Sequence, residues 1–169
     1  TTPSPGRLCP GATTTQKEQS VPIAKIQRLQ PDARIPTYGS DGAACFDFYA
    51  YSPAVRTYLH ANAPVVFNTG AAIEVPEGWA LLIYSRSGHG FKSDTRLSNC
   101  VGVIDSDYRG EIKVRLIRDT LSDSHPHYID HEDRIAQGML VPVTKTYFEI
   151  VNQLSTTERG AGGFGSTGK

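Results

Sequence analysis

The residues whose types and spacing best suit chemistry lie in the stretch GVIDSDYRGEIKVR, residues 102–115. Val103 and Ile104 are apolar and β-branched, the middle of the stretch is acidic, and apolar and charged residues alternate after Gly110. This pattern predicts a strand, a tight acidic turn and a second strand that together form a hairpin. Asp105 falls where the first strand ends, so its carboxylate is held by regular backbone on one side and open on the other. A carboxylate in that position is well placed to act as a general base.

A second group of residues suits phosphate. The apolar run GWALLIY is followed directly by Ser85, Arg86, Ser87 and Gly88. An arginine offers a fork of donors to phosphate oxygens, a serine adds a hydroxyl, and a glycine lets the backbone approach closely. A phosphate grip is one interpretation of this turn, and a surface turn with an exposed arginine is the other.

The glycine-rich stretch RGAGGFGSTGK is a third candidate. Residues 163–169 spell G-x-x-x-x-G-K, but the hydroxyl residue and the helix that complete a P-loop do not follow, so no P-loop is expected. Two interpretations stay open, a terminus without regular structure and a mobile arm that wraps phosphates. In the second, Phe164 stacks on a base while Arg159, Ser166 and Thr167 bind phosphate.

The other polar clusters each have two interpretations. Asp47 is an acid among apolar neighbours, which an outward-facing strand position also explains. The run EDRIAQ, residues 132–137, is compatible with a solvated hairpin that carries a local ion pair. His125, His127 and His131 lie close together with acidic residues, but a polar loop fits them better than a metal site. No histidine and acid are placed to activate Ser87 as a nucleophile, so a catalytic triad is not expected.

The elements that must position these residues are short. No segment keeps helical spacing over three turns, and turn residues separate the apolar runs. The pattern predicts an all-β barrel or sandwich with one short helix within residues 90–96. We expect strands within residues 23–29, 46–51, 65–67, 71–75, 79–84, 99–104, 111–117, 135–143 and 147–151.

Length and composition limit the classes of protein. The 169 residues suit a single domain, preceded by a polar leader over residues 1–20 that we expect to be disordered. Lysine and arginine number 17, as do aspartate and glutamate, and this balance argues against binding to nucleic acid or to an anionic membrane. Three cysteines without a C-x-x-C motif favour a reducing, cytoplasmic setting, and no apolar run is long enough to span a membrane.

In this order, the motifs resemble those of the trimeric dUTP pyrophosphatase (dUTPase) family. DGAACFDFYA is similar to the first of five family motifs, SRSG to the second, and NCVGVIDSDYRGEIKV to the third. EDRIAQ is similar to the fourth motif and RGAGGFGSTG to the fifth. The resemblance covers residues 21–169, and its third and fifth motifs are long and specific.

The fold that this resemblance implies is a jelly-roll-like β-barrel, residues 21–152, assembled as a homotrimer. Residues 153–169 are then a flexible, glycine-rich C-terminal arm that closes the active site of a neighbouring subunit. Each active site is expected to contain groups from three subunits.

The implied reaction is the hydrolysis of dUTP to dUMP and pyrophosphate, which limits uracil incorporation into DNA and supplies dUMP for dTMP synthesis. By resemblance, Asp105 activates the water that attacks the α-phosphorus. Tyr108 lies under the deoxyribose and excludes a 2′-hydroxyl, and Lys113 borders the base. The uracil edge is read by a group of neighbouring residues and their backbone: Asn99, Gly102, Val103 and Ile104.

The resemblance also assigns the phosphate groups. The α- and β-phosphates are expected to meet Arg86, Ser87 and Gly88, and the arm closes over the substrate through Arg159, Phe164, Gly165, Ser166 and Thr167. Mg²⁺ is the implied cofactor. It is expected to be carried by the triphosphate and water without a direct protein ligand, with Asp47 and Gln137 beside its water shell and Arg134 as support.

Four residues, in three of the motif regions, depart from the family pattern. Phe46 stands where a tyrosine or similar residue is usual. His89 and Gly90 replace a leucine–alanine-like pair, which puts the helix behind the phosphate grip in question. Gly138 replaces an apolar residue, and either a gap in the trimer interior or a bend in the strand would follow.

Two other functions are considered beside hydrolysis of dUTP. A dCTP deaminase-like or bifunctional relative would use a glutamate on the second strand of the hairpin as its base, and Glu111, which precedes that strand, is the nearest candidate. A nucleotide-gated regulator would instead recognise a protein partner when dUTP is bound. The intact acidic turn and glycine-rich stretch favour hydrolysis over both.

Overall fold

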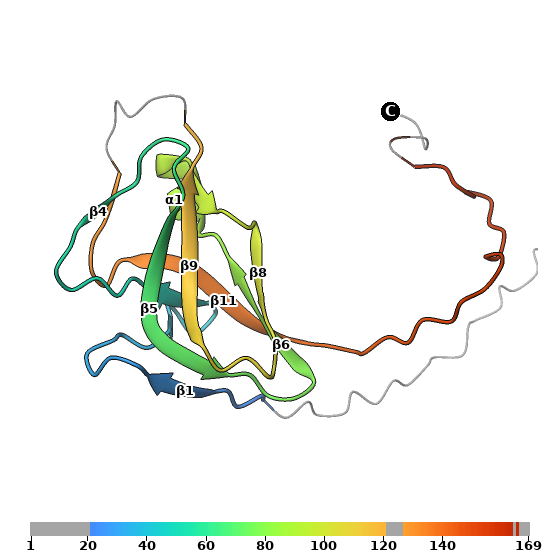
Figure 1. Ribbon diagram of the computed structural model, residues 1–169, viewed down its shortest axis with the longest axis horizontal. Coiled ribbons are helices and arrows are strands. Elements are labelled where there is room, and N and C mark those ends of the chain that lie inside the picture. Colours follow the sequence, from blue (N-terminus) through green and yellow to red (C-terminus); the bar gives the residue numbers. More distant parts are fainter. Residues whose placement is uncertain (1–20, 121–126, 164, 166–169) are drawn as a thin grey trace, which may run out of the picture.

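The computed structural model describes residues 21–120, 127–163 and 165. The predicted leader, residues 1–20, lies outside them. The described part is built mostly from β-strands in two main sheets that face each other, with one short helix, and a long arm after the last strand (Figure 1). The expectation of a β fold with one helix is therefore confirmed. No helix within this described part is long and apolar enough to cross a membrane.

The first sheet has four antiparallel strands. Its order is β1 (Lys25–Arg28), β5 (Val65–Glu74), β9 (Glu111–Arg118) and β7 (Thr95–Leu97). β9 shows why this sequence forms a strand: Ile112, Val114 and Leu116 are each 1% exposed, whereas the intervening Lys113 and Arg115 are exposed. This alternation with a period of two places one face of the sheet in the core.

The second sheet has five antiparallel strands, in the order β2 (Thr37–Tyr38), β3 (Phe46–Tyr49), β11 (Arg134–Pro142), β6 (Trp79–Tyr84) and β8 (Val101–Ile104). A separate pair is formed by β4 (Thr57–Tyr58) and β10 (Tyr128–Ile129). One buried cluster joins the sheets, and its members include Phe48, Leu81 and Ile83 from this sheet and Phe67, Ile73 and Leu116 from the first.

The predicted hairpin at the third motif does not form, and this is a correction. β8 pairs with β6, whereas β9 pairs with β5 and β7, so the two strands belong to different sheets. The acidic turn therefore connects sheets instead of closing a ladder. Each strand finds its partner far away in the sequence, which the local pattern could not reveal.

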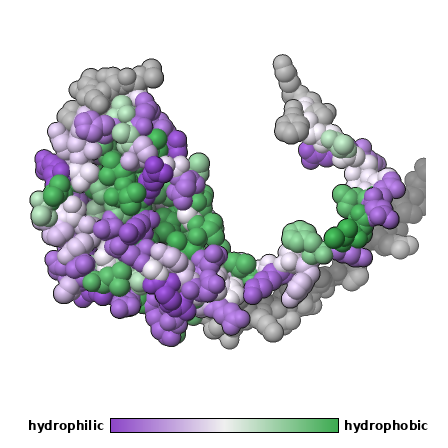
Figure 2. All heavy atoms as spheres, viewed as in Figure 1, coloured by the Kyte–Doolittle hydropathy of each residue, from purple (hydrophilic) through white to green (hydrophobic). Residues whose placement is uncertain are grey.

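Two further strand predictions were inaccurate. The runs at 65–67 and 71–75 are one strand, β5, whose register shifts between Asn68 and Ala72. Gly70 has a φ of +66° at this irregularity, and a Cβ there would lie 2.7 Å from the Cβ of Ala33. Residues 147–151 form no strand within the single chain. Tyr147 and Phe148 are each 93% exposed, and no strand of the described chain pairs with them. Figure 2 shows hydrophobic residues exposed along the arm.

The helix α1 spans Ser87–Ser93, so it begins and ends earlier than the predicted 90–96. It ends because Asp94 adopts a left-handed conformation and donates its N–H to the carbonyl of His89. The next residues pair with β9 instead of continuing the helix. His89 and Gly90 both lie within α1, so the helix behind the phosphate grip forms with these residues present.

Gly138 leaves no gap within the described chain. It lies opposite Phe46 in the β3–β11 ladder, and a Cβ there would come within 2.8 Å of the Phe48 ring and 3.1 Å of Phe46. Aromatic rings thus occupy the space that a side chain at position 138 would need. Phe46 and Gly138 are therefore a cross-strand pair in which the aromatic ring lies over the glycine.

Candidate active site

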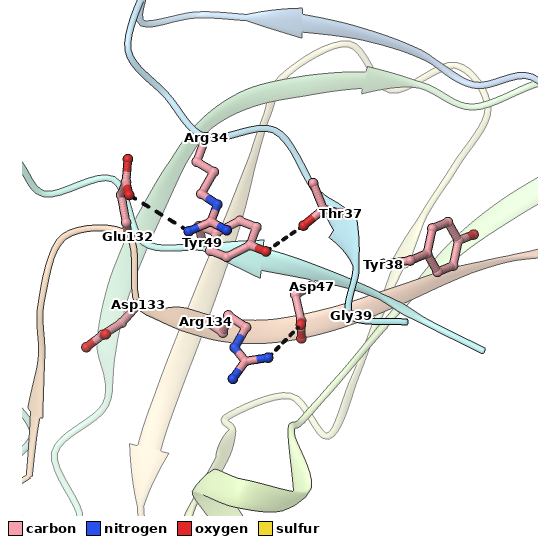
Figure 3. A pocket seen from close by; sticks show the side chains of 9 residues that line it. All are labelled: Arg34, Thr37, Tyr38, Gly39, Asp47, Tyr49, Glu132, Asp133 and Arg134. Carbon is pink, nitrogen blue, oxygen red and sulfur yellow. Dashed lines mark hydrogen bonds and ion pairs between the residues drawn. The ribbon is translucent and has the colours of Figure 1, made fainter. Parts of the chain in front are cut away.

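Two arginines from separate motifs, Arg86 and Arg134, contact the carboxylate of Asp47. Asp47 is 8% exposed on β3, and its Oδ1 accepts a hydrogen bond of 2.8 Å from Nε of Arg86. Its Oδ2 lies 3.4 Å from Nη1 of Arg134, at the start of β11 (Figure 3). Asp47 lies on the face of β3 opposite the core residue Phe48, where two arginine side chains cover it, and Arg134 forms a long-range ion pair instead of a purely local one. Asp47 fixes both guanidinium groups at the open end of the second sheet.

The turn that carries Arg86 is tied down from two sides. Gln137 on β11 donates from Nε2 to the carbonyl of Ser85 at 2.9 Å. The Ser85 hydroxyl accepts the backbone N–H of Leu97, on β7, at 2.9 Å. A cavity of about 450 Å³ opens beside this turn, and it is lined by Ser85, Arg86, Ser87, Gly90, Phe91 and Gln137. Ser87 and Gly88 are exposed here, so a phosphate group can reach them.

A second cavity of about 350 Å³ adjoins the same cluster. The Arg34 guanidinium lies over the Tyr49 ring, 3.9 Å from its centroid, and the Tyr49 hydroxyl is 2.6 Å from that of Thr37. Figure 3 shows that these side chains line the same cavity as the Asp47–Arg134 pair. They support β3 from the side away from the Arg86 turn, a contribution that the sequence pattern did not indicate.

The residues expected to read a base lie on β8, at the edge of the second sheet. Among the described strands β8 pairs only with β6, so its other edge presents backbone N–H and carbonyl groups to incoming partners. Gly102 lies opposite Ile83, and a Cβ at this glycine would be 3.3 Å from that side chain. The Asn99 side chain lies beside Gly102, and Val103 is 60% exposed. A flat, partly apolar edge of this kind suits a planar base.

Asp105 follows β8 directly and is exposed. The backbone N–H of Tyr108 donates to the Asp105 carbonyl at 3.2 Å, and the Tyr108 hydroxyl donates to the carbonyl of Glu111 at 3.0 Å. A Cβ at Gly110 would lie 2.4 Å from the Tyr108 hydroxyl oxygen. Glycine at this position therefore lets the ring lie flat over the turn. The turn holds an open carboxylate and an aromatic face side by side.

Asp105 and the Arg86 turn are far apart within one chain. In the antiparallel β6–β8 pair, Ile104 lies opposite Leu81 and Val101 lies opposite Tyr84. Asp105 thus leaves the pair at one end, and Arg86 leaves it at the other. At about 3.3 Å per residue, the two backbones are about 20 Å apart. A water activated by Asp105 could not reach a phosphate held by Arg86 of the same chain.

Within the single chain, Arg159 of the arm contacts neither Asp105 nor the Arg86 turn. Residues 143–163 run away from the sheets after the Val143 N–H donates to the Gly78 carbonyl (Figure 1). Nε of Arg159 donates to the carbonyl of Gly162 at 2.7 Å, which is a local contact. Gly165 has a φ of +90°, which favours glycine. The predicted site residues Phe164, Ser166 and Thr167 lie outside the described residues.

Glu111 and Lys113 stand next to each other on β9. The Glu111 carboxylate accepts the Gly70 N–H at 2.9 Å and lies 3.9 Å from the Lys113 ammonium. Oε1 of Glu111 therefore accepts a backbone N–H at the irregularity of β5, which gives this carboxylate a structural role. Lys113 is exposed on the outer face of the first sheet.

His127 and His131 have separate partners. His127 lies 3.3 Å from the Ser93 hydroxyl, whereas Nδ1 of His131 accepts the Ser52 N–H at 3.2 Å. Burial lowers the pKa of His127, and the nearby His89 and Arg118 lower that pKa further. Within residues 21–120, 127–163 and 165, no group of three or more acidic, histidine or cysteine side chains is arranged to hold a metal ion.

Comparisons with known proteins give one consistent family. A family model described as dUTPase matches residues 31–168. The deoxyuridine 5′-triphosphate nucleotidohydrolase of Nautilia profundicola is 42% identical over 145 residues, which cover 86% of this chain and 98% of that protein. The corresponding protein of Bdellovibrio bacteriovorus is 40% identical over 150 residues, covering 89% of this chain and 97% of the relative.

Solved structures agree on the fold. The dUTPase of Staphylococcus bacteriophage 80alpha with dUpNHpp has a TM-score of 0.71 and 24% identity, covering 87% of this chain and 99% of that one. The dUTPase from phage phi11 of S. aureus has a TM-score of 0.69 and 21% identity, covering 80% and 99% of the two chains. At these identities the likeness concerns the arrangement of the strands alone.

Proposed function

The chain belongs to the dUTPase family, and from this premise we propose that it hydrolyses dUTP to dUMP and pyrophosphate in sites shared between subunits. One observation carries the proposal of shared sites. The phosphate-binding candidates gather around Asp47, about 20 Å from the candidate base Asp105. A homotrimer unites the two groups if Asp105 of one subunit faces Arg86 of the next.

On the phosphate side, Arg86 and the exposed Ser87 and Gly88 bind the α- and β-phosphates. Asp47 holds the Arg86 guanidinium in a fixed orientation, so little side-chain entropy is lost when substrate binds. Fixed cations of this kind stabilise charge that builds up on the phosphates in the transition state. Arg134, held by the same carboxylate, supports Arg86.

On the base side, uracil lies against the free edge of β8. Backbone groups of Gly102, Val103 and Ile104, together with the Asn99 amide, pair with its polar edge. A cytosine amino group would mispair with the same fixed groups, and a C5 methyl would collide with them. The Tyr108 ring lies under the deoxyribose, and Lys113 borders the base.

The chemical step needs one base. Asp105 takes a proton from water, the water oxygen attacks the α-phosphorus, and the bond from that phosphorus to the bridging oxygen breaks. Pyrophosphate leaves with the electron pair, and dUMP remains. Because no covalent enzyme intermediate is needed, catalysis rests on positioning and charge neutralisation.

Mg²⁺ fits this site as an ion carried by the triphosphate. Both carboxylate oxygens of Asp47 already contact guanidinium groups, so direct coordination by Asp47 would have to displace them. The Gln137 amide nitrogen donates to Ser85, which directs its oxygen toward other partners such as metal-bound water. When bound, the ion supplies charge neutralisation of the phosphates.

The arm is proposed to close a neighbouring subunit's site. Its apolar residues Tyr147, Phe148 and Ile150 are each more than 90% exposed in the single chain, and burial against a second copy would remove this surface from water. The glycine-rich end then brings Arg159, Ser166 and Thr167 to the terminal phosphate and Phe164 over the uracil. The two facing sheets would form the jelly-roll-like barrel of each subunit.

Turnover of dUTP with Mg²⁺ tests the function, and Asp105→Asn tests the base. We expect this substitution to lower kcat by about 10²–10⁴-fold, because the general base is lost, with little change in stability because the side chain is exposed. Asp107→Asn, two residues further along the same turn and also exposed, is the matched control. Wild-type turnover by Asp105→Asn would refute the assignment.

The deaminase alternative is tested with dCTP. Glu111, its nearest candidate base, has its carboxylate engaged by the Gly70 N–H, so we expect no release of ammonia. Measurable ammonia release from dCTP would overturn hydrolysis of dUTP as the sole reaction. A regulatory protein partner stays a separate expectation that hydrolysis does not oppose.

A further inference from the structure

The carbonyl group of Arg134, at the start of β11, connects the second sheet to the helix α1. The register between β3 and β11 shifts between Arg134 and Ala136, so the ladder is irregular at this point. The carbonyl oxygen lies 2.6 Å from Nε2 of His89 and 3.5 Å from Nη1 of Arg86. Because a carbonyl only accepts, Nε2 of His89 carries the hydrogen in this contact.

His89 is fixed at its backbone as well as at its ring. Its carbonyl accepts the Ser93 hydroxyl at 2.9 Å and the Asp94 N–H that ends the helix. Its ring lies edge-on to that of His127, with 5.5 Å between the centroids. The side chain therefore has a defined place between α1 and β11, and it occupies a position where the family pattern has an apolar residue.

We propose that His89 is a positioning residue for the phosphate grip: its ring N–H anchors α1 to the Arg134 carbonyl and so sets Arg86, Ser87 and Gly88 in their binding arrangement. The inference rests on the proposed function of the Arg86 turn. His89 touches no substrate in this scheme. It acts through the backbone of α1 and through the carbonyl that Arg86 shares.

The contacts show what would remain without the ring. Arg86 keeps its 2.8 Å bond to Asp47, but its 3.5 Å contact with the Arg134 carbonyl is at the limit of a hydrogen bond. Ser85 keeps its bond from Gln137 on β11, whereas Gly88, directly before His89, loses its nearest link to that strand. The part of the site that binds phosphates is loosened, whereas Asp105 and the β8 edge are untouched.

A His89 variant should therefore lose affinity for ligands that carry phosphates and keep its affinity for ligands that lack them. We expect His89→Leu to raise KM for dUTP about tenfold, the size of one net hydrogen bond, and to change kcat by less than about twofold. The dissociation constant of the non-hydrolysable analogue dUpNHpp should rise about as much, and that of deoxyuridine should stay within about twofold of wild type.

His89→Gln, whose amide can donate to the same carbonyl, should restore most of the loss in KM. Lys92→Leu, an exposed change on the same helix, is the control.

Several outcomes would overturn the proposal. They are an unchanged KM in His89→Leu, equal effects of the Leu and Gln variants, or an equal loss of affinity for deoxyuridine, which would indicate only a damaged fold. If the Leu variant does not fold, nitrogen NMR of the wild-type imidazole decides, because the proposal requires hydrogen on Nε2 of His89 and an Nδ1–H tautomer contradicts it. A wild-type chain that binds dUpNHpp but does not turn over dUTP would refute the proposed function while the binding series still tests His89.

Discussion

Asp105 and Arg86 leave opposite ends of the antiparallel pair β6–β8, about 20 Å apart along the strands. The distance exceeds what an activated water and a bound phosphate can bridge. In the proposed mechanism, a second copy of the chain therefore brings the carboxylate of Asp105 to the phosphate. We propose that these two ends are half-sites, one for uracil and water and one for phosphate.

Removal of the Asp47 charge should weaken the phosphate half-site. Asp47→Asn leaves the Arg86 and Arg134 guanidinium groups without the carboxylate that orients them. We expect KM for dUTP to rise about tenfold and the free energy of unfolding to fall by about 1–3 kcal/mol. Steady-state kinetics and urea unfolding measure the two effects. Glu77→Gln, an exposed surface change, is the control, and equal behaviour of the two variants would contradict the role of Asp47.

A side chain at position 138 should destabilise the fold. Gly138→Ala places a Cβ 2.8 Å from the Phe48 ring and 3.1 Å from Phe46, and we expect a loss of about 1–3 kcal/mol from overpacking. Gly42→Ala, with no atom within 4 Å of the new Cβ, is the matched control in urea unfolding. Phe46→Leu added to Gly138→Ala should recover part of the loss, and strict additivity would argue against a matched pair.

Removal of the arm's end should affect activity more than folding. The residues from Arg159 on make local contacts only, within the described part of the chain, so deletion of residues 160–169 should leave the thermal midpoint nearly unchanged. Turnover of dUTP should fall at least 100-fold if the arm closes the site and excludes water. Full activity in a folded, deleted protein would remove the arm from the mechanism.

Acid should destabilise the fold through His127. Its folded pKa lies below the ordinary value because of burial and the nearby His89 and Arg118. The unfolded chain then binds more protons between the folded pKa and about 6.5, so stability falls as pH drops through this window. Below the folded pKa this destabilisation is complete, and above about 6.5 it is absent. Urea unfolding of His127→Asn should show a weaker pH dependence there, and a slope equal to that of wild type would contradict it.

Local pattern was sufficient for single elements. The alternation of apolar and charged residues predicted β9, and the apolar run GWALLIY predicted β6, whose observed bounds are Trp79–Tyr84. The position of the Arg86 turn followed from the end of that strand. A strand whose apolar pattern lies in its own residues could therefore be predicted from the sequence.

Features set by distant partners could not be predicted. The hairpin was wrong because β8 and β9 pair with strands of different sheets, and no partner within the described chain pairs with residues 147–151. The neighbours of Gly138 are brought to it by pairing with β3 and β6. His89 was noted only as a departure, although a polar residue at an apolar family position was the available signal for its contact with Arg134.

Mixed trimers test the shared site most directly. Asp105→Asn and Arg86→Gln chains, each inactive alone and carrying a different affinity tag, are coexpressed, and assemblies with both tags are isolated. In each doubly tagged trimer, one of the three sites, about a third, would combine an intact Asp105 from one chain with an intact Arg86 from another. The account predicts that dUTP turnover returns to about that fraction of wild type. Doubly tagged assemblies that stay inactive would contradict it, because each site would then be built from a single chain.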